Sequence, residues 1–116
     1  MEKTYKLEWY GNTYDIALRK TTYTSNDTLA IAMVSIDKDG CEEDFGMLTT
    51  NIGESNILAD ETSAFVDTNN LTKKIISWLT NNKIAKKTPF TGFSGYCSYP
   101  LMAFNQKVLN EMVEYA

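Results

Sequence analysis

The hydrophobic periodicity of the chain changes near its midpoint, and this change restricts the folds that it can adopt. Up to Val66, apolar and polar residues alternate in short segments, which is typical of β-strands. From Leu71 onward, apolar residues recur at the spacing of a helix. Strands followed by helices favour an α+β fold. We therefore expect a mostly antiparallel sheet of four to six strands with two helices, largely on one face.

The first half predicts two β-hairpins. Residues 5–10 and 13–21 alternate on either side of a Gly11-Asn12 turn. Residues 28–36 are almost continuously apolar, which predicts a central strand covered on both faces. A turn that ends at Gly40 then leads into a returning strand over residues 44–52.

The second half predicts a short strand, a helix and a long loop. Residues 53–62 are expected to form a loop that is docked by Ile57 and Leu58, and residues 63–66 a short buried strand. The polar residues that follow are typical of a helix N-cap, so we expect a helix from Leu71 to about Asn81. Its apolar stripe consists of Leu71, Ile75, Trp78 and Leu79.

The remaining residues predict a loop and a second helix. Residues 83–99 contain Pro89, Gly92 and Gly95, which indicates a long loop. A short strand over residues 101–104 would follow. Asn105 would then cap a last helix. The residues expected on the apolar side of that helix are Val108, Leu109, Met112 and Val113.

The composition is that of one globular domain over residues 1–116, of which 43% are hydrophobic. No apolar run is long enough to span a membrane, and the N-terminal residues lack the apolar segment of a signal peptide. Cys41 and Cys97 form no CxxC pair, and we expect both to be reduced thiols. These observations predict a soluble cytoplasmic protein that does not contact membranes.

The charge is unevenly distributed along the chain. Residues 1–67 carry thirteen acids and five bases, whereas residues 68–116 carry two acids and six bases, and the net charge is -4. A fold that keeps the two halves apart would have an acidic side and a basic side. A fold that interleaves them would not, and the sequence leaves both arrangements open.

The sequence does not indicate an enzyme. There is no histidine, so the commonest general base and the commonest transition-metal ligand are missing. Cys97 has no histidine to activate it and is expected to be a buried thiol. Asp67 follows a predicted strand, and its expected role is to bind backbone N–H groups at the helix start. The only catalytic arrangement that can be written pairs Asp67 with Cys97 or Tyr99.

No metal or cofactor site is expected. An acidic stretch surrounds Gly40, but the glycine comes too early for a calcium-binding loop and Leu48 occupies the position of the bidentate acid. We expect this stretch to be a solvated hairpin tip. No phosphate-binding glycine loop is present, so no nucleotide cofactor is predicted.

The best candidate for a binding site lies in residues 83–99, where basic residues stand beside aromatic ones. Lysines can contact phosphates or acidic groups, and exposed aromatic rings can provide stacking or docking surfaces. In the alternative reading, the aromatic rings fold inward to hold the loop and the lysines are only solvated. The candidate residues are Lys83, Lys86, Lys87, Phe90, Phe93 and Tyr96.

Two motifs carry a resemblance to a known family. The segment AFVDTNN at residues 64–70 and the segment SGYCSYPL at residues 94–101 resemble the motifs of an uncharacterised family of small proteins. Members of this family occur on conjugative elements, plasmids and phages of Gram-positive bacteria. The resemblance covers about residues 28–105 and implies a mobile-element accessory protein.

We therefore expect a non-enzymatic protein that binds and inhibits or modulates a host protein. By analogy with other small acidic proteins of mobile elements, the host protein would be a defence nuclease, as for an anti-CRISPR protein. The alternative is a nucleic-acid-binding module that uses residues 83–99. The acidic residues expected to contact the partner are Asp37, Asp39, Glu42, Glu43 and Asp44.

Overall fold

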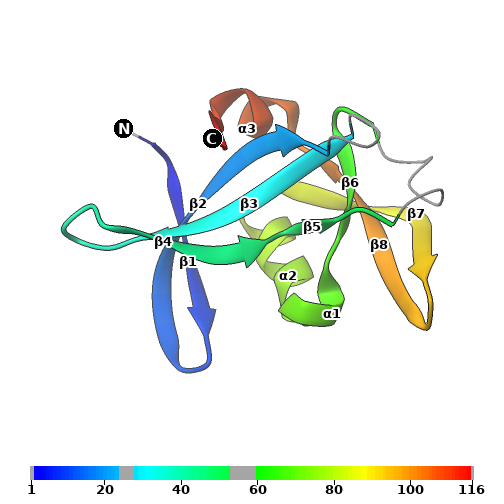
Figure 1. Ribbon diagram of the computed structural model, residues 1–116, viewed down its shortest axis with the longest axis horizontal. Coiled ribbons are helices and arrows are strands. Elements are labelled where there is room, and N and C mark those ends of the chain that lie inside the picture. The colour runs from blue at the N-terminus through cyan, green and yellow to red at the C-terminus, as the bar shows by residue number, and fades with distance from the viewer. Residues whose placement is uncertain (1, 24–27, 53–59, 116) are drawn as a thin grey trace.

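The strands form two sheets instead of the single sheet that the sequence predicts. The computed structural model describes residues 2–23, 28–52 and 60–115 (Figure 1). Four strands of the first sheet lie in the order β1-β2-β3-β4, and adjacent strands are antiparallel. Their bounds are Thr4–Trp9 (β1), Asn12–Thr22 (β2), Leu29–Ile36 (β3) and Glu42–Met47 (β4).

Both predicted hairpins of the first half are present. The turn between β1 and β2 consists of Tyr10 and Gly11, one residue earlier than predicted, and both residues have positive φ. This conformation suits a two-residue hairpin turn because it matches the twist of the flanking strands. In β3, the residues from Leu29 to Val34 are buried, as expected for a central strand.

The second sheet contains the remaining antiparallel strands in the order β5-β6-β8-β7. Its strands are Thr49–Thr50 (β5), Ser63–Val66 (β6), Ala85–Ser94 (β7) and Cys97–Phe104 (β8). The predicted returning strand at residues 44–52 is therefore divided between the two sheets. Residues 53–59, which include the predicted docking residues Ile57 and Leu58, lie outside the described residues.

Leu48 connects the two sheets. Its side chain is fully buried, its N–H donates to the carbonyl oxygen of Ile31 at 2.9 Å, and its carbonyl oxygen accepts from the N–H of Asp67 at 2.9 Å. The chain thus leaves β4 in the first sheet and enters β5 in the second without an intervening loop. Residues of both sheets contribute to one core as a result.

The described part of the chain has three helices, whereas the sequence predicts two. They are Thr68–Leu71 (α1), Lys74–Asn81 (α2) and Gln106–Glu111 (α3). The predicted helix from Leu71 to Asn81 is interrupted at Thr72, which has φ 62° and ψ 167° and cannot continue a helix. The interruption lets Leu71 and the buried residues of α2 face the same core.

The last helix is shorter than predicted. The Asn105 side chain caps it by accepting from the N–H of Lys107, and Val108 and Leu109 are buried as expected. The prediction that Val113 lies on this helix is wrong. Instead, Val113–Glu114 forms a short strand, β9, that pairs in parallel with Arg19 and Lys20 of β2.

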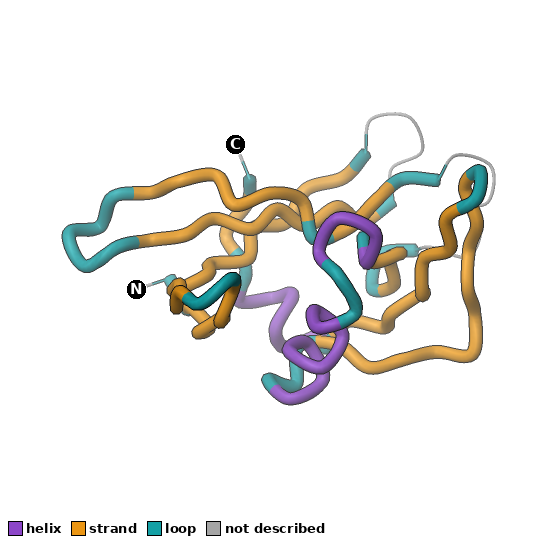
Figure 2. The backbone as a smooth tube through the Cα atoms, turned by 90° about the horizontal axis from the view of Figure 1, so that it is seen from below, coloured by secondary structure: helices purple, strands orange, loops and turns teal. Residues whose placement is uncertain are grey.

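The main core lies between the sheets and the helices. It joins residues of β2 and β3 to residues of β6, β8, α2 and α3, and Figure 2 shows α1 and α2 side by side next to the strands. Trp78 of α2 packs against Tyr5 and donates through Nε1 to the carbonyl oxygen of Lys6 at 2.7 Å. Burial of this apolar surface is the main source of stability. Within the described ranges, no helix has the length and apolar character needed to cross a membrane.

Candidate partner-binding surface

Residues 83–99, predicted as a long loop, mostly form a β-hairpin. β7 pairs with β8 from Ala85↔Phe104 to Ser94↔Cys97, and the turn consists of Gly95 and Tyr96. Gly95 has φ 60°, a conformation that glycine adopts without steric cost. The predicted strand at residues 101–104 is therefore the inner end of a longer strand, and the hairpin projects from the body of the protein (Figure 1).

Pro89 lies in a bulge of β7 rather than in a loop. The pairing jumps from Lys87↔Met102 to Thr91↔Pro100, so three residues of β7 lie opposite Leu101. The Thr88 hydroxyl holds the bulge together, since it donates to the carbonyl oxygen of Leu101 at 2.8 Å and accepts from the N–H of Phe90 at 3.2 Å. Proline is tolerated here because β7 is an edge strand.

A second, smaller core anchors the hairpin. It consists of Ile52, Phe65 and Leu101, with Tyr99 packed against it. Gly92 of β7 lies directly on this cluster. A Cβ atom at this position would lie 2.7 Å from Cε1 of Phe65 and would also collide with Ile52. The absence of a side chain at Gly92 thus allows β7 to approach the cluster closely.

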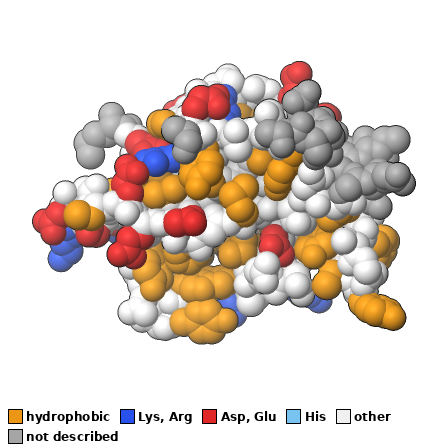
Figure 3. All heavy atoms as spheres, in the orientation of Figure 1, with side chains coloured by type: hydrophobic (Ala, Val, Ile, Leu, Met, Phe, Trp, Pro, Cys, Tyr) orange, Lys and Arg blue, Asp and Glu red, His pale blue; other side chains and the backbone are white. Residues whose placement is uncertain are grey.

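The aromatic side chains of the hairpin are exposed. Phe90 is 49% exposed, Phe93 is 63% exposed and Tyr96 is fully exposed. Figure 3 shows hydrophobic side chains protruding at this end of the molecule. The inward-folded alternative considered from the sequence is therefore wrong for these three rings. Among the aromatic residues of the hairpin, Tyr99 does fold inward, because it packs against the smaller core.

Two of the three predicted lysines line a groove at the base of the hairpin. Lys83 and Lys86 border a groove of about 520 Å³ together with Thr80, Asn105 and Gln106. Lys87 follows on the same strand and is also exposed. The structure thus brings all six basic and aromatic candidates into one hairpin and its base, which we call the hairpin surface: Lys83, Lys86, Lys87, Phe90, Phe93 and Tyr96.

The predicted acidic residues lie at the other end of the long axis, on the β3–β4 hairpin. Figures 1 and 3 show this hairpin and its acidic side chains on the opposite side from the β7–β8 hairpin. All five acids are exposed. Since the molecule measures 41 × 28 × 22 Å, the two candidate sets do not form one surface. The five acids are Asp37, Asp39, Glu42, Glu43 and Asp44.

Some of these acids have structural partners. Asp37 Oδ1 accepts from the N–H groups of Asp39 and Cys41 at 2.9 Å, which stabilises the turn. Glu42 pairs with Arg19 at 2.7 Å, and Arg19 also pairs with Glu2 at 2.9 Å. The hydrogen bonds that Arg19 donates to Glu42 and Glu2 raise the pKa of Arg19, and the one to Glu42 lowers the pKa of Glu42.

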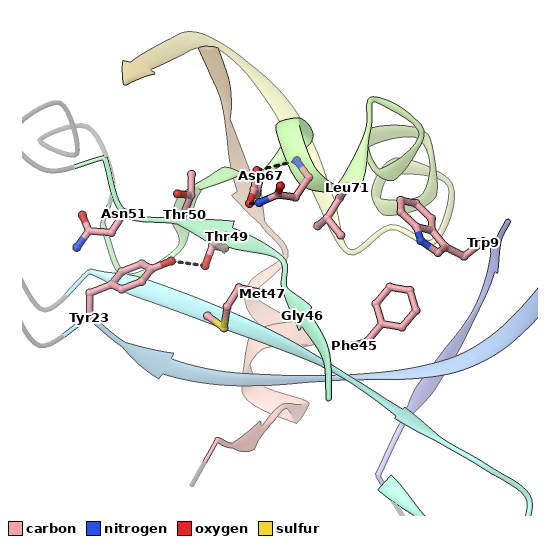
Figure 4. A pocket seen from close by; sticks show the side chains of 11 residues that line it. Trp9, Tyr23, Phe45, Gly46, Met47, Thr49, Thr50, Asn51, Asp67 and Leu71 are labelled. Carbon is pink, nitrogen blue, oxygen red and sulfur yellow. Dashed lines mark hydrogen bonds between the residues drawn. The ribbon is translucent and has the colours of Figure 1, made fainter. Parts of the chain in front are cut away.

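A groove of about 630 Å³ lies where the chain passes from β4 to β5 (Figure 4). One end is apolar and includes Trp9, Phe45 and Leu71. The other end is polar and includes Asp67 and the Tyr23 hydroxyl, which is 2.9 Å from Thr49 Oγ1. The sequence did not indicate this groove.

Asp67 has the structural role that the sequence predicts. Its Oδ1 accepts from the backbone N–H of Asn70 at 3.1 Å, which caps α1, and its Oδ2 accepts from Asn70 Nδ2 at 2.8 Å. The AFVDTNN segment therefore ends β6 and starts a helix, although that helix is α1 and not one that begins at Leu71.

The charge of Asp67 also acts on two tyrosines. Burial, and then the Asp67 charge, raise the pKa of Tyr23, while its hydrogen bond with Thr49 lowers it. Burial, the hydrogen bond with Cys97 and the Asp67 charge raise the pKa of Tyr99. A raised pKa keeps a phenol protonated near neutral pH and makes it a poorer acid.

The thiols and carboxylates of the described residues do not gather into a metal site. Cys41 is exposed and Cys97 is half-buried, so the prediction that Cys97 is a buried thiol is wrong, and neither cysteine forms a disulfide. Across residues 2–23, 28–52 and 60–115, no group of three or more metal-ligating side chains comes together.

Comparison with known protein families matches residues 17–115 to a domain of unknown function, DUF4313. The chain belongs to the DUF4313 family. The match includes the β7–β8 hairpin, the AFVDTNN segment and most of the groove lining, but it begins after β1. Neither a curated protein nor a solved structure matches the chain. Membership of the DUF4313 family therefore places the hairpin inside the shared domain without assigning it an activity.

Proposed function

We propose that this DUF4313 protein is a non-enzymatic accessory protein of a mobile element, and that it uses the hairpin surface to bind and inhibit or modulate a host protein. The observation that carries the proposal is the exposure of Phe90, Phe93 and Tyr96 on a projecting hairpin. Large aromatic side chains are enriched among the residues that dominate binding energy at protein interfaces. Three of them in solvent on one hairpin are a ready contact surface.

The edge of β7 favours docking by side chains over pairing by backbone. Pro89 has no N–H to donate, and the bulge at residues 88–90 interrupts the edge. Lys86 and Lys87 add charge to the same strand. These features hinder the addition of a partner strand along β7 while leaving the aromatic rings accessible.

The charge of the hairpin surface favours an acidic partner. Lys83 and Lys86 border the groove at its base, so a carboxylate-rich surface would meet positive charge there. Lys87 is the next residue of β7, and its side chain leaves the opposite face of the sheet. A partner with acidic groups around an apolar patch would satisfy both the lysines and the aromatic rings. In the proposed setting, a host defence nuclease is one such partner.

The experiment is a quantitative capture from host lysate with two matched variants. In the first variant, Phe90, Phe93 and Tyr96 are all changed to Ser. In the second, only Tyr10, an exposed aromatic residue on the β1–β2 turn, is changed to Ser. We expect one host protein to be retained by the wild type and by the Tyr10→Ser variant and lost at least tenfold with the triple variant. Equal capture by all three proteins would contradict the proposal.

Nucleic acid remains the second candidate partner, because the lysines and aromatic rings of the hairpin surface are exposed together. A nucleic-acid complex would weaken steeply as salt increases, since lysines that contact phosphates release counterions. The same capture performed after nuclease digestion separates the two candidates. Loss of the captured material after digestion would favour nucleic acid, and its persistence would favour a protein.

A further inference from the structure

We infer that the groove between β4, β5 and α1 is a binding site for an alkylammonium group, such as a lysine side chain or a small primary amine, with the ammonium at Asp67 and the alkyl stem on Phe45 and Trp9. The site lies away from the hairpin surface and does not depend on the function proposed for it. The groove holds about 630 Å³, which is within the usual range of small-ligand sites.

The charge at the polar end is negative and not neutralised by the described residues. Among the described residues that line the groove, Asp67 is the only one with a carboxylate side chain, and none is a lysine or arginine. Within the described ranges, salt bridges join Lys6 to Asp15 and Arg19 to Glu2 and Glu42, and none reaches Asp67. A cation in the groove would therefore find an available carboxylate partner.

The neighbouring groups at this end can support a cation. The Tyr23 hydroxyl lies on the opposite wall beside Thr49, and the Asp67 charge contributes to raising the pKa of Tyr23. Both Asp67 oxygens accept hydrogen bonds from Asn70, which orient the carboxylate but leave acceptor capacity on each oxygen. An ammonium has three donors and no acceptor, so it can use the Asp67 carboxylate and the nearby hydroxyl oxygens.

The opposite end suits an apolar stem. Trp9 and Phe45 pack edge to face with ring centroids 6.0 Å apart, and Leu71 of α1 forms the wall beside them. In the view of Figure 4, Leu71 lies between Asp67 and Trp9. A ligand with one charged end and a short hydrocarbon chain can thus lie along the groove. A neutral sugar would not neutralise the charge at the polar end of the groove, and a compact metal ion would not cover the apolar end.

The test is a titration followed by amide NMR shifts of Gly46 and Asn70, which line the groove. The probes are butylammonium, hexylammonium and, as the neutral counterpart, hexanol. We expect hexylammonium to bind at least tenfold more tightly than hexanol, and the affinity to rise about fourfold for each added methylene group. Similar affinities for hexylammonium and hexanol would overturn the inference.

Two variants with the same change in net charge locate the effect. Asp67→Asn removes the charge but keeps a residue that caps helices equally well, so the fold should persist. Asp39→Asn removes a charge at the distant β3–β4 turn. We expect only Asp67→Asn to weaken hexylammonium binding, by about tenfold, while hexanol binding stays the same. An equal effect of both variants would contradict a site at Asp67.

A further arm distinguishes two sources of the ammonium group. Nα-acetyl-lysinamide presents a lysine side chain on a blocked backbone. If it binds with the same dependence on Asp67 as hexylammonium, the natural ligand is a lysine of a polypeptide. If only hexylammonium binds, the groove takes a free amine. Failure of both to bind more tightly than hexanol would overturn the inference.

Discussion

Thr72 separates α1 from α2 in a backbone conformation that is populated almost only by glycine. Its hydroxyl compensates in part by accepting from the N–H of Lys74 at 3.3 Å. Neither glycine nor proline marks this position, so the sequence pattern predicted one helix through it. The need to bury Leu71 and Ile75 in one core determines the break, and that need is not visible in local residue preferences.

We expect Thr72→Gly to raise the free energy of unfolding by about 1 kcal/mol, because glycine adopts this conformation without strain. Thr72→Ala keeps the strain and loses the hydroxyl, so it should lower the free energy of unfolding slightly. Urea denaturation of the three proteins measures both effects. A Thr72→Gly protein less stable than Thr72→Ala would show that the backbone is not strained there.

The β7–β8 hairpin is the element whose structure differs most from the sequence prediction. Pro89, Gly92 and Gly95 are typical of a loop, but each has a separate function in the hairpin: Pro89 lies in an edge bulge, Gly92 allows a close approach and Gly95 forms the turn. Pairing of β8 with both β6 and β7 supplies the hydrogen bonds that outweigh the local preference. Such long-range pairing is not encoded in local periodicity.

Gly92 provides the test at the scale of this element. Gly92→Ala should lower the free energy of unfolding by about 1–3 kcal/mol, because the new Cβ collides with the buried Phe65 ring and Ile52. Ser94→Ala, on the same strand but exposed, is the control and should change stability little. Thermal unfolding of both variants is the measurement. A Gly92→Ala protein as stable as the control would show that the hairpin is not packed as described.

The elements of the first half were easier to predict. The strand predicted at residues 28–36 is the central strand β3, Leu29–Ile36, which is buried up to Val34. In the second half, Asn105 caps a helix as expected, and so does Asp67 at the junction of the halves, because these signals are local. For the hairpin surface, the sequence predicts which basic and aromatic residues take part but not how they are arranged in space. Exposure of Phe90 and Phe93 depends on how the hairpin packs on Phe65 and Ile52. The groove was not predicted, since Trp9, Tyr23, Phe45 and Asp67 come from separate parts of the chain.

At the scale of the whole molecule, the fold separates two charged hairpins along a 41 Å axis. The acidic β3–β4 hairpin lies at one end, and the β7–β8 hairpin, which carries Lys86, Lys87 and the exposed aromatic rings, lies at the other end, so part of the uneven charge of the sequence becomes an uneven charge in space. A molecule of this kind is oriented by the field of its partner before contact. The field of an acidic partner would therefore orient the protein so that the hairpin surface faces that partner on encounter.

The measurement that tests this account most directly is site-specific photo-crosslinking in cells. Benzoyl-phenylalanine replaces Phe93 on the β7–β8 hairpin in one protein and Tyr10 on the β1–β2 turn in another, both exposed aromatic positions. We expect the probe at position 93 to crosslink a host protein that the probe at position 10 does not. Identical crosslinks from both positions, or adducts at position 93 that contain only nucleic acid, would contradict the central claim.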